Sequence, residues 1–327
     1  VYFMGPTNVV NAENQIYTEA GFYDAQKDYA EFDKNAKFRS LDGKRRANGD
    51  KIRYDGKNST SYLEGNAYFQ DSTRTIVADV IKYNQKTDVY ETNGQTQIQD
   101  GDQIIMADGK SAYDAENDEA IFTDNVRIIN PPQFMTADSI RYSQKTHSGR
   151  AFGNIYWEDT TENMTIICSE AEFNDETEFF LASGRPLMST VIDGDTLYLS
   201  ADTLKSFLEI PADSTSRIVI GNIDVRVYKS DLQAICDSMS YSQRDSMFSL
   251  FKNPVVWSDT SQFVSDTVRI QLTDNSIDKI YLLKNSFIIN SPDELFFNQV
   301  KGRDVIAYFK DDELREMQVL GNGESVY

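Results

Sequence analysis

The stretch Ala137-Asp138-Ser139-Ile140-Arg141-Tyr142 is followed, eleven residues later, by Gly153-Asn154-Ile155-Tyr156-Trp157. We call these two sequence motifs the first and second phrase. The six positions of the first phrase hold, in order, a small residue, an acidic residue, a spacer, an apolar residue, a second spacer and an aromatic residue. The second phrase is a Gly-Asn pair that leads into an alternating run. Both phrases recur along the chain, and this recurrence decides the fold.

The recurrence has a period of about thirty residues. The first phrase returns as GDKIRY at 49–54 and ADVIKY at 78–83, and degenerate copies continue to RDVIAY at 303–308. Its final aromatic residue lies at positions 54, 83, 113 and 142, so the intervals are 29, 30 and 29 residues. A fixed period of this size indicates a stacked repeat architecture.

Apolar and polar residues alternate inside each phrase. Ile81 and Tyr83 flank Lys82, and Arg141 is flanked in the same way. Such alternation places the apolar set on one face of a β-strand and the charges on the other. We interpret the Gly-Asn pairs as tight turns, because they supply the positive φ angles that β-turns need. The sequence therefore predicts an all-β fold with two short antiparallel strands in each repeat.

The repeat also sets the predicted domain organisation. It is unbroken, which predicts a single continuous domain over 1–327, with regular repeats over 1–190 and looser repeats over 191–327. The chain begins inside what reads as a strand, and Tyr327 follows a turn phrase directly. We therefore expect the sequence to be truncated at both ends and a leader segment to have been removed.

The charge balance narrows the range of partners. The chain has 52 Asp and Glu against 32 Lys and Arg, a formal net charge of −20. This argues against nucleic acid, whose binding depends on cations that neutralise phosphates. It also argues against docking on anionic lipid headgroups. No apolar run approaches the ~20 residues of a membrane-spanning helix.

Residues suited to catalysis or metal binding are few. The only histidine, His147, lies in a predicted hairpin loop, which leaves a catalytic triad or a His-rich metal site nearly excluded. One acid recurs in each copy and could form a calcium ladder or a carboxylate pair. We interpret it instead as a group that bonds a backbone N–H at a turn, because each copy offers a single acid. We predict no catalytic residue, no metal site and no cofactor.

The two cysteines occupy the small-residue position of the repeat. Cys168 and Cys236 stand where other copies have Gly49, Ala78 or Ala137. We call each successive strand position along the stack a rung. Equivalent positions two rungs apart lie about 10 Å from each other, beyond the reach of a disulfide. We predict that they form no bridge.

The inner face of the stack is the candidate binding surface. The apolar side chains predicted to line it are Ile52, Tyr54, Phe69, Ile81, Tyr83, Ile98, Ile128, Ile140, Tyr142, Ile155 and Trp157. Two interpretations stay open. These side chains fill a closed core, or the two sheets splay apart at one edge and leave a continuous apolar groove.

The repeat resembles the OstA/LptA-like family of lipopolysaccharide transport, including the periplasmic domain of the outer-membrane lipopolysaccharide-assembly protein. The phrases that carry the resemblance are 49–54 with Gly65-Asn66, 78–83 with Gly94, and 137–142 with Gly153-Asn154. The resemblance implies an elongated β-jellyroll of two antiparallel sheets in a V shape, with roughly 30-residue repeats. The family's usual domain is shorter than this chain, and the acidity of this chain is a departure from the family.

The resemblance also implies a function. It is that of a non-enzymatic periplasmic bridge in a Gram-negative bacterium, which shields the acyl chains of lipopolysaccharide in an apolar groove on the way to the outer membrane. The implied partners are lipopolysaccharide and like-fold jellyroll proteins of the inner-membrane and outer-membrane complexes, joined by end-to-end strand pairing, with self-association also possible. The alternative is a closed β-solenoid that acts as a scaffold or adhesin of the cell surface.

Overall fold

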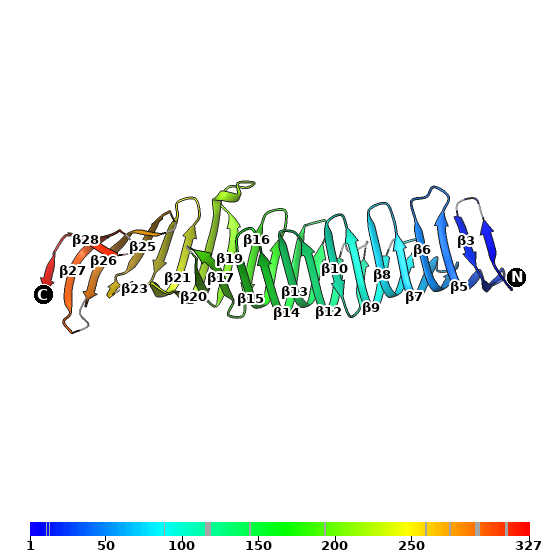
Figure 1. Cartoon of the computed structure of the whole chain (residues 1–327), viewed down its shortest axis with the longest axis horizontal. Helices are drawn as coiled ribbons and strands as arrows, with labels where there is room; N and C mark the ends of the chain where they lie inside the picture. The colour runs from blue at the N-terminus through cyan, green and yellow to red at the C-terminus, as the bar shows by residue number, and fades with distance from the viewer. Residues whose placement is uncertain are drawn as a thin grey trace. The chain divides into compact units, whose positions relative to one another are not determined.

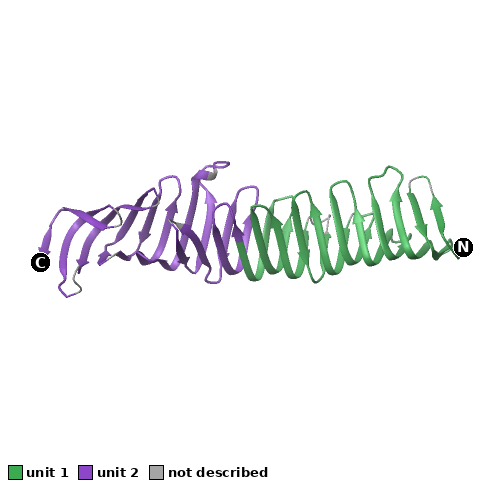
Figure 2. Ribbon diagram, in the orientation of Figure 1, with its two compact units in different colours: residues 1–157 green, residues 158–327 purple. Residues whose placement is uncertain are grey.

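The computed structural model describes most of the chain. The described residues are 1–10, 12, 14–87, 89–114, 119–143, 145–192, 194–258, 260–274, 276–291, 295–310 and 313–327. They fall into two compact units, Val1–Trp157 and Glu158–Tyr327, which Figure 2 colours green and purple. We describe each unit by itself.

Unit 1 consists of β-strands stacked side by side (Figure 1). The predicted all-β class with stacked antiparallel strands is confirmed. Its strands are β1 (Tyr2–Phe3), β2 (Thr7–Val10), β3 (Asn14–Thr18), β4 (Ala20–Asp24), β5 (Tyr29–Ser40), β6 (Arg46–Asp55), β7 (Thr60–Gln70), β8 (Arg74–Asn84), β9 (Val89–Asp100), β10 (Gln103–Ala107), β11 (Ser111–Asp114), β12 (Glu119–Asn130), β13 (Gln133–Ser143) and β14 (Ser148–Asp159), of which the last two residues are counted with unit 2. Most are longer than the short strands that the sequence predicts.

Unit 2 repeats the arrangement with more interrupted strands. They are β15 (Met164–Asn174), β16 (Phe179–Ser183), β17 (Leu187–Ile192), β18 (Asp195–Ser200), β19 (Thr203–Leu208), β20 (Arg217–Lys229), β21 (Leu232–Ser242), β22 (Met247–Phe251), β23 (Val255–Ser258), β24 (Ser261–Val264), β25 (Thr267–Thr273), β26 (Ser276–Asn290), β27 (Asn298–Lys310), β28 (Glu313–Leu320) and β29 (Glu324–Val326). A 3₁₀ turn, η1 (Ser214–Ser216), lies in the connection after β19.

Each long strand has two halves that belong to different layers. In unit 2 the first half of β15 pairs with β17, whereas its second half pairs with β16. The strands β16 and β17 continue to β19 and β18 respectively, so the two ladders run separately. In each unit we call the layer that contains the aromatic end of the repeat wall A, and the other layer wall B. In β8, for example, Arg74–Ala78 lies in wall B and Val80–Asn84 lies in wall A.

The two walls of unit 1 face each other. Phe69 is in register with Ile76 on wall B, and Tyr83 lies seven residues further along the same strand as Ile76. A straight strand would separate residues 76 and 83 by about 23 Å. The ring centroids of Phe69 and Tyr83 are nevertheless 5.6 Å apart. The strands therefore bend sharply between the walls, and the inner faces pack against each other.

The bend occurs at the Gly-Asn pairs, whose role differs here from the one predicted. Gly153 (φ 72°) and Asn154 (φ 45°) lie in the middle of β14, not in a hairpin turn. Gly65 and Asn66 have the same backbone in β7, where the ladder to β8 skips from Glu64 to Ala67. Two successive left-handed residues form a bulge that redirects the strand. The prediction of positive φ was correct for these two pairs, and the prediction of a tight turn was wrong. At Gly221-Asn222 the prediction of positive φ was also wrong, because the bulge there is formed by Ile223 (φ 63°) and Asp224 (φ 51°).

The other strand of each pair bends at the recurrent acid. Ala78 and Ile81 are both buried in β8, although strict alternation would place them on opposite faces. Asp79 lies between them at the bend, which we call the corner. The residues whose side chains point inward therefore change there from even-numbered to odd-numbered positions. The small position before the corner residue, which is an acid in every one of these copies except the one with Ser169, is buried: Gly49, Ala78, Ala137, Cys168, Ala201, Cys236 and Ser265. A small residue is needed because two walls converge on that position.

Both cysteines occupy this position as free, buried thiols, as predicted. Within the part of the chain that the structure describes, no helix has the length and apolar character needed to cross a membrane.

Candidate functional site

The inner face of unit 1 is formed by rows of side chains in cross-strand register. On wall A an aromatic row runs across the strands: Tyr54, Ser61, Tyr83, Tyr90, Tyr113, Ala120 and Tyr142. Closer to the corner runs a second row, which we call the aliphatic row after its Ile and Leu members although it also contains Phe, Thr and Ser: Phe32, Ile52, Leu63, Ile81, Thr92, Ser111, Phe122 and Ile140. On wall B the inward row is Phe38, Ala47, Phe69, Ile76, Ile98, Ile105, Ile128 and Met135.

Nine of the eleven predicted inner-face residues lie on these three rows. Ile52, Ile81 and Ile140 belong to the aliphatic row. Tyr54, Tyr83 and Tyr142 belong to the aromatic row, and Phe69, Ile98 and Ile128 to wall B. Ile155 and Trp157 lie on β14, where Ile155 is buried and Trp157 is partly exposed. Nine of the eleven residues thus lie on inward rows of the two walls, and their role in lipid binding stays a prediction.

Exposure varies along the rows of unit 1. On wall B, Phe69, Ile76 and Met135 are buried, whereas Ile98, Ile105 and Ile128 between them keep partial contact with solvent. On wall A, Tyr83 and Tyr90 are buried, whereas Tyr113 and Tyr142 are partly exposed. An inward-facing apolar side chain that still meets solvent indicates that the walls do not seal against each other at that rung. Each strand from β9 to β13 has a partly exposed inward position, and Phe38 of β5 and Tyr54 of β6 are partly exposed as well.

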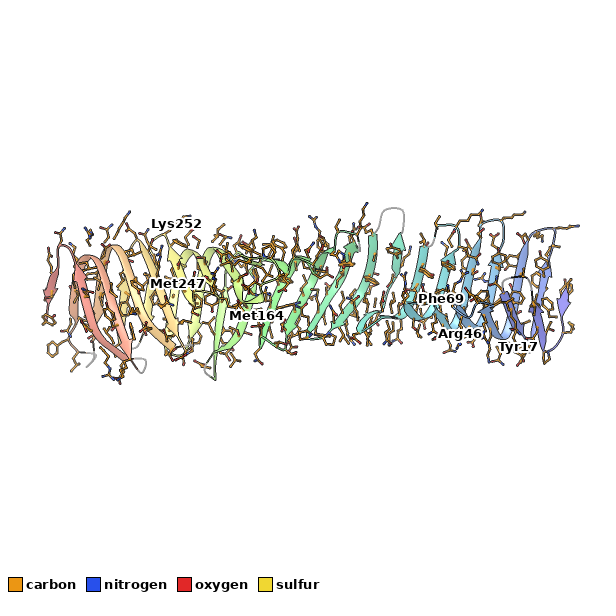
Figure 3. All side chains as sticks on the ribbon, turned by 90° about the horizontal axis from the view of Figure 1, so that it is seen from above. Tyr17, Arg46, Phe69, Met164, Met247 and Lys252 are labelled. Carbon is orange, nitrogen blue, oxygen red and sulfur yellow. The ribbon has the colours of Figure 1, made fainter. Side chains whose placement is uncertain are left out.

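An aromatic contact joins the walls at the neighbouring rungs. Phe69 of wall B, which Figure 3 labels, lies with its ring centroid 5.1 Å from that of Tyr90 on wall A. Tyr83 and Tyr90 stack with their centroids 4.4 Å apart. The guanidinium of Arg74 reaches from the outer end of wall B to 5.6 Å from the Tyr90 centroid. Interactions of this kind add to the burial of the rings themselves.

On wall B, the inner face of unit 2 is more completely buried than that of unit 1. Its wall B row is apolar and buried at every one of these positions: Ile166, Met188, Leu199, Val227, Ala234, Val256, Phe263, Ile288 and Val300. Phe263 also meets Phe309 of wall A, with centroids 6.1 Å apart. On wall A, Tyr241 and Phe248 stack at 4.4 Å, and burial raises the pKa of Tyr241. Unit 2 therefore resembles a packed core along wall B.

The recurrent acids hold the corners together. Asn154 donates from Nδ2 to both carboxylate oxygens of Asp138. The same pair occurs between Asn285 and Asp266, at 3.0 Å. Asp79 accepts from the backbone N–H of Gln95 at 3.1 Å, which is the role that the sequence predicts for these acids. Among the described residues, no group of three or more His, Cys, Asp or Glu is placed to hold a metal ion.

Several inner residues, including Tyr90, Ile76 and Ile105, are absent from the sequence-based prediction. They lie in the halves of the repeat that have no recurring phrase, so only local alternation could have identified them. Tyr90 and Thr92 in β9 alternate with polar residues, which is such a signal. Their contact with wall B depends on the bend at the corner, and periodicity alone does not predict it.

Part of the chain matches a known family. Residues 9–89 match the model described as LptA/(LptD N-terminal domain) LPS transport protein. No curated protein matches the chain. Among solved structures, LptH, the LptA-homologous periplasmic component of the lipopolysaccharide transport device from Pseudomonas aeruginosa, aligns with 11% identity and a TM-score of 0.21, covering 45% of this chain and 80% of LptH. The matched segment spans β2 to β8 and reaches the start of β9 in unit 1, and through it the resemblance drawn from the repeat is confirmed: this chain carries an LptA/(LptD N-terminal domain)-like segment over residues 9–89.

Proposed function

We propose that this protein takes part in lipopolysaccharide transport in the periplasm, and that it does so by covering acyl chains with the inner face of unit 1. The family match over residues 9–89 supports the process. The observation that carries the finer claim is the row of Ile98, Ile105 and Ile128, which faces inward and yet stays partly exposed. No covalent chemistry is needed for this role.

The physical basis is removal of apolar surface from water. Burial contributes about 25 cal/mol per Å², so a fatty acyl chain gains several kcal/mol on any sufficiently apolar track. Successive rungs offer nearly equivalent contacts, because the row repeats with the strand spacing of ~4.8 Å. A chain can therefore move between rungs without returning fully to water. Electrostatic attraction to an anionic headgroup plays a smaller part, since the protein carries a net charge of −20.

We further propose that residues 1–327 act as one continuous repeat domain, and that the terminal strands pair end to end with jellyroll proteins of the two membrane complexes. Edge strands carry unpaired N–H and C=O groups that favour such pairing. β28 and β29 each pair with β27 among the described strands, so their other edges are the candidates at that end.

Site-specific photo-crosslinking tests the acyl-binding proposal. A photoreactive amino acid at Ile128 or Tyr142, on the inner face, should give lipopolysaccharide adducts in cells that make this lipid. The matched neighbours Arg127 and Arg141, which point outward, should give few or none. Equal labelling of inner and outer positions, or none at either, would contradict the proposal.

The buried wall B row of unit 2 favours a second function for that unit, namely a closed scaffold. A photoreactive residue at Val256 or Ile288, both buried, distinguishes the two roles. Adducts at these positions would extend the lipid track into unit 2. Their absence, together with adducts at Ile128, would assign lipid contact to unit 1 and a supporting role to unit 2.

A further inference from the structure

The outer face of wall B in unit 2 carries an unusual concentration of exposed large apolar side chains. They are Ile167, Leu187, Val191, Tyr198, Tyr228, Ile235 and Trp257, and we call them the wall B patch. Tyr228 is 53% exposed and Ile167 is 52% exposed. Each lies on a strand that also has buried inward positions, so the outward direction follows from the alternation of the strand.

The wall B patch is contiguous across six strands. Ile167 is in register with Leu187, and Val191 lies four residues further along β17 on the same face. Tyr198 is in register with Tyr228, and their ring centroids lie 6.4 Å apart. One rung beyond, Gln233 pairs with both Tyr228 and Trp257, and Ile235 follows Gln233 on the same side of β21. The patch therefore forms one surface.

Among the described residues, no acid stands between the members of this patch, in a chain that has 52 acidic residues. The outward positions between them are neutral or basic: Thr165, Ser189, Thr196, Ser200, Arg226, Gln233, Val255 and Gln262. Asp224, at the corner beside the patch, is paired with Arg226 at 3.1 Å. Wall A of the same unit carries Glu170 and Glu172 on its outer face. Two copies that meet through an acidic face would repel each other, and two copies that meet through the wall B patch would not.

The size and composition fit a protein contact. The seven side chains, each about 200 Å² when free and roughly half exposed, present on the order of 700 Å², close to the ~800 Å² that each partner buries in a standard interface. Tyr and Trp are among the residue types that dominate such contacts. Neutral amides lie between them, and the Nε1 of Trp257 already donates to Gln262 Oε1 at 3.1 Å. A lipid-binding face would carry more Lys and Arg than the single Arg226.

We propose that the wall B patch is the surface through which two copies of this chain associate face to face. A two-fold arrangement places the same residues on both sides of the contact, so a patch without acids meets a patch without acids. This inference does not depend on the proposed lipid transport.

Sedimentation velocity of the 327-residue chain tests the proposal. The chain should show a monomer–dimer equilibrium at about 10–100 μM protein. The dimer fraction should rise with salt, because salt screens repulsion between the acids elsewhere on the two copies. Tyr228→Glu should weaken dimerisation at least about tenfold, since it brings a charge onto both sides of the contact.

Ile223→Glu is the matched control. Ile223 is 59% exposed in the same strand, β20, and lies at the corner, outside the wall B patch. The substitution adds the same charge and should leave dimerisation unchanged. Both variants should keep the thermal unfolding midpoint that the parent protein has at a concentration low enough for it to be monomeric. A chain that stays monomeric at the highest concentration, a dimer that Tyr228→Glu leaves intact, or a monomer that instead co-sediments with phosphatidylcholine vesicles would each overturn the proposal.

Discussion

The side-chain amide of Asn154 donates hydrogen bonds to both carboxylate oxygens of Asp138: its Nδ2 lies 3.1 Å from Oδ1 and 2.9 Å from Oδ2. The two residues stand sixteen positions apart in the sequence, on strands that bend together. Gly153 lies directly beside the carboxylate, and a Cβ built on it would overlap Asp138 Oδ2. The acid and the Gly-Asn pair of the repeat are therefore the two sides of one corner.

Gly153→Ala should destabilise unit 1 by about 1–3 kcal/mol, because it combines a positive φ with this overlap. Urea unfolding followed by tryptophan fluorescence measures the change. Gly43→Ala is the matched control, since Gly43 also has a positive φ (75°), but a Cβ at that position would meet no atom within 4 Å. It should cost about 1–2 kcal/mol, from the positive φ alone, and therefore less than Gly153→Ala. Equal losses at 43 and 153 would show that the carboxylate plays no part.

Phe69→Ala should lower the free energy of unfolding by about 3–5 kcal/mol, as expected for a large buried ring. Phe69 is 3% exposed and joins wall B to Tyr83 and Tyr90 of wall A. Tyr68→Ala, one position earlier on the outer face, should cost about 1 kcal/mol. Urea unfolding of both variants is the measurement. Similar losses at 68 and 69 would contradict the contact between the walls.

The two thiols should resist alkylation in the folded protein. Burial raises the pKa of Cys168 to about 11 and that of Cys236 to about 12, so the reactive thiolate is scarce near neutral pH. Iodoacetamide should modify neither cysteine until urea unfolds the chain, as mass spectrometry can follow. Ile167→Cys, which places a thiol at an exposed position next to Cys168, should react rapidly under the same conditions. Rapid labelling of the parent protein would contradict the burial.

The corner acid Asp304 should contribute to acid sensitivity. The backbone N–H of Lys284, with help from Arg303, holds the pKa of Asp304 below its usual range. A carboxyl group whose pKa is lower in the folded state stabilises the fold above its unfolded pKa of about 3.9, and this contribution disappears as the pH falls through the folded value. Asp304→Asn should therefore lower the unfolding midpoint at about pH 7 and have little effect near pH 2.

Thermal unfolding across this pH range provides the test for Asp304. Ser325→Ala, at an exposed position of β29 that does not titrate, should shift the midpoint by the same small amount at every pH. A difference between Asp304→Asn and the parent protein that persists unchanged at the acidic end would rule out the linkage.

Many residues of the inner face could be predicted from the sequence, because the direction of a side chain in a strand depends on its close neighbours in the chain. Ile81 and Tyr83 alternate with Lys82, and the side-chain direction in a strand depends only on this short-range pattern. The same reasoning placed Cys168 and Cys236 in a position that excludes large side chains. Gly65-Asn66 and Gly153-Asn154 were correctly predicted as positive-φ positions, since Gly and Asn accept that backbone more readily than most residues.

Contacts between the walls could not be derived in this way. Whether Gly153-Asn154 closes a hairpin or bends a long strand depends on the partner strand and on Asp138, which is distant in the sequence. The contact of Phe69 with Tyr90, and the partial exposure of Ile98 against the burial of Ile76, depend on how closely two layers approach at each rung.

The sequence by itself determined that this protein is a stack of β-strands with one apolar face, because periodicity and backbone preference are properties of a few neighbouring residues. Tertiary structure decided where that face is buried and where solvent still reaches it, and which outer wall carries a patch without acids. Those properties arise when distant strands pair in register, and only then do side chains such as Tyr198, Tyr228 and Trp257 become one surface.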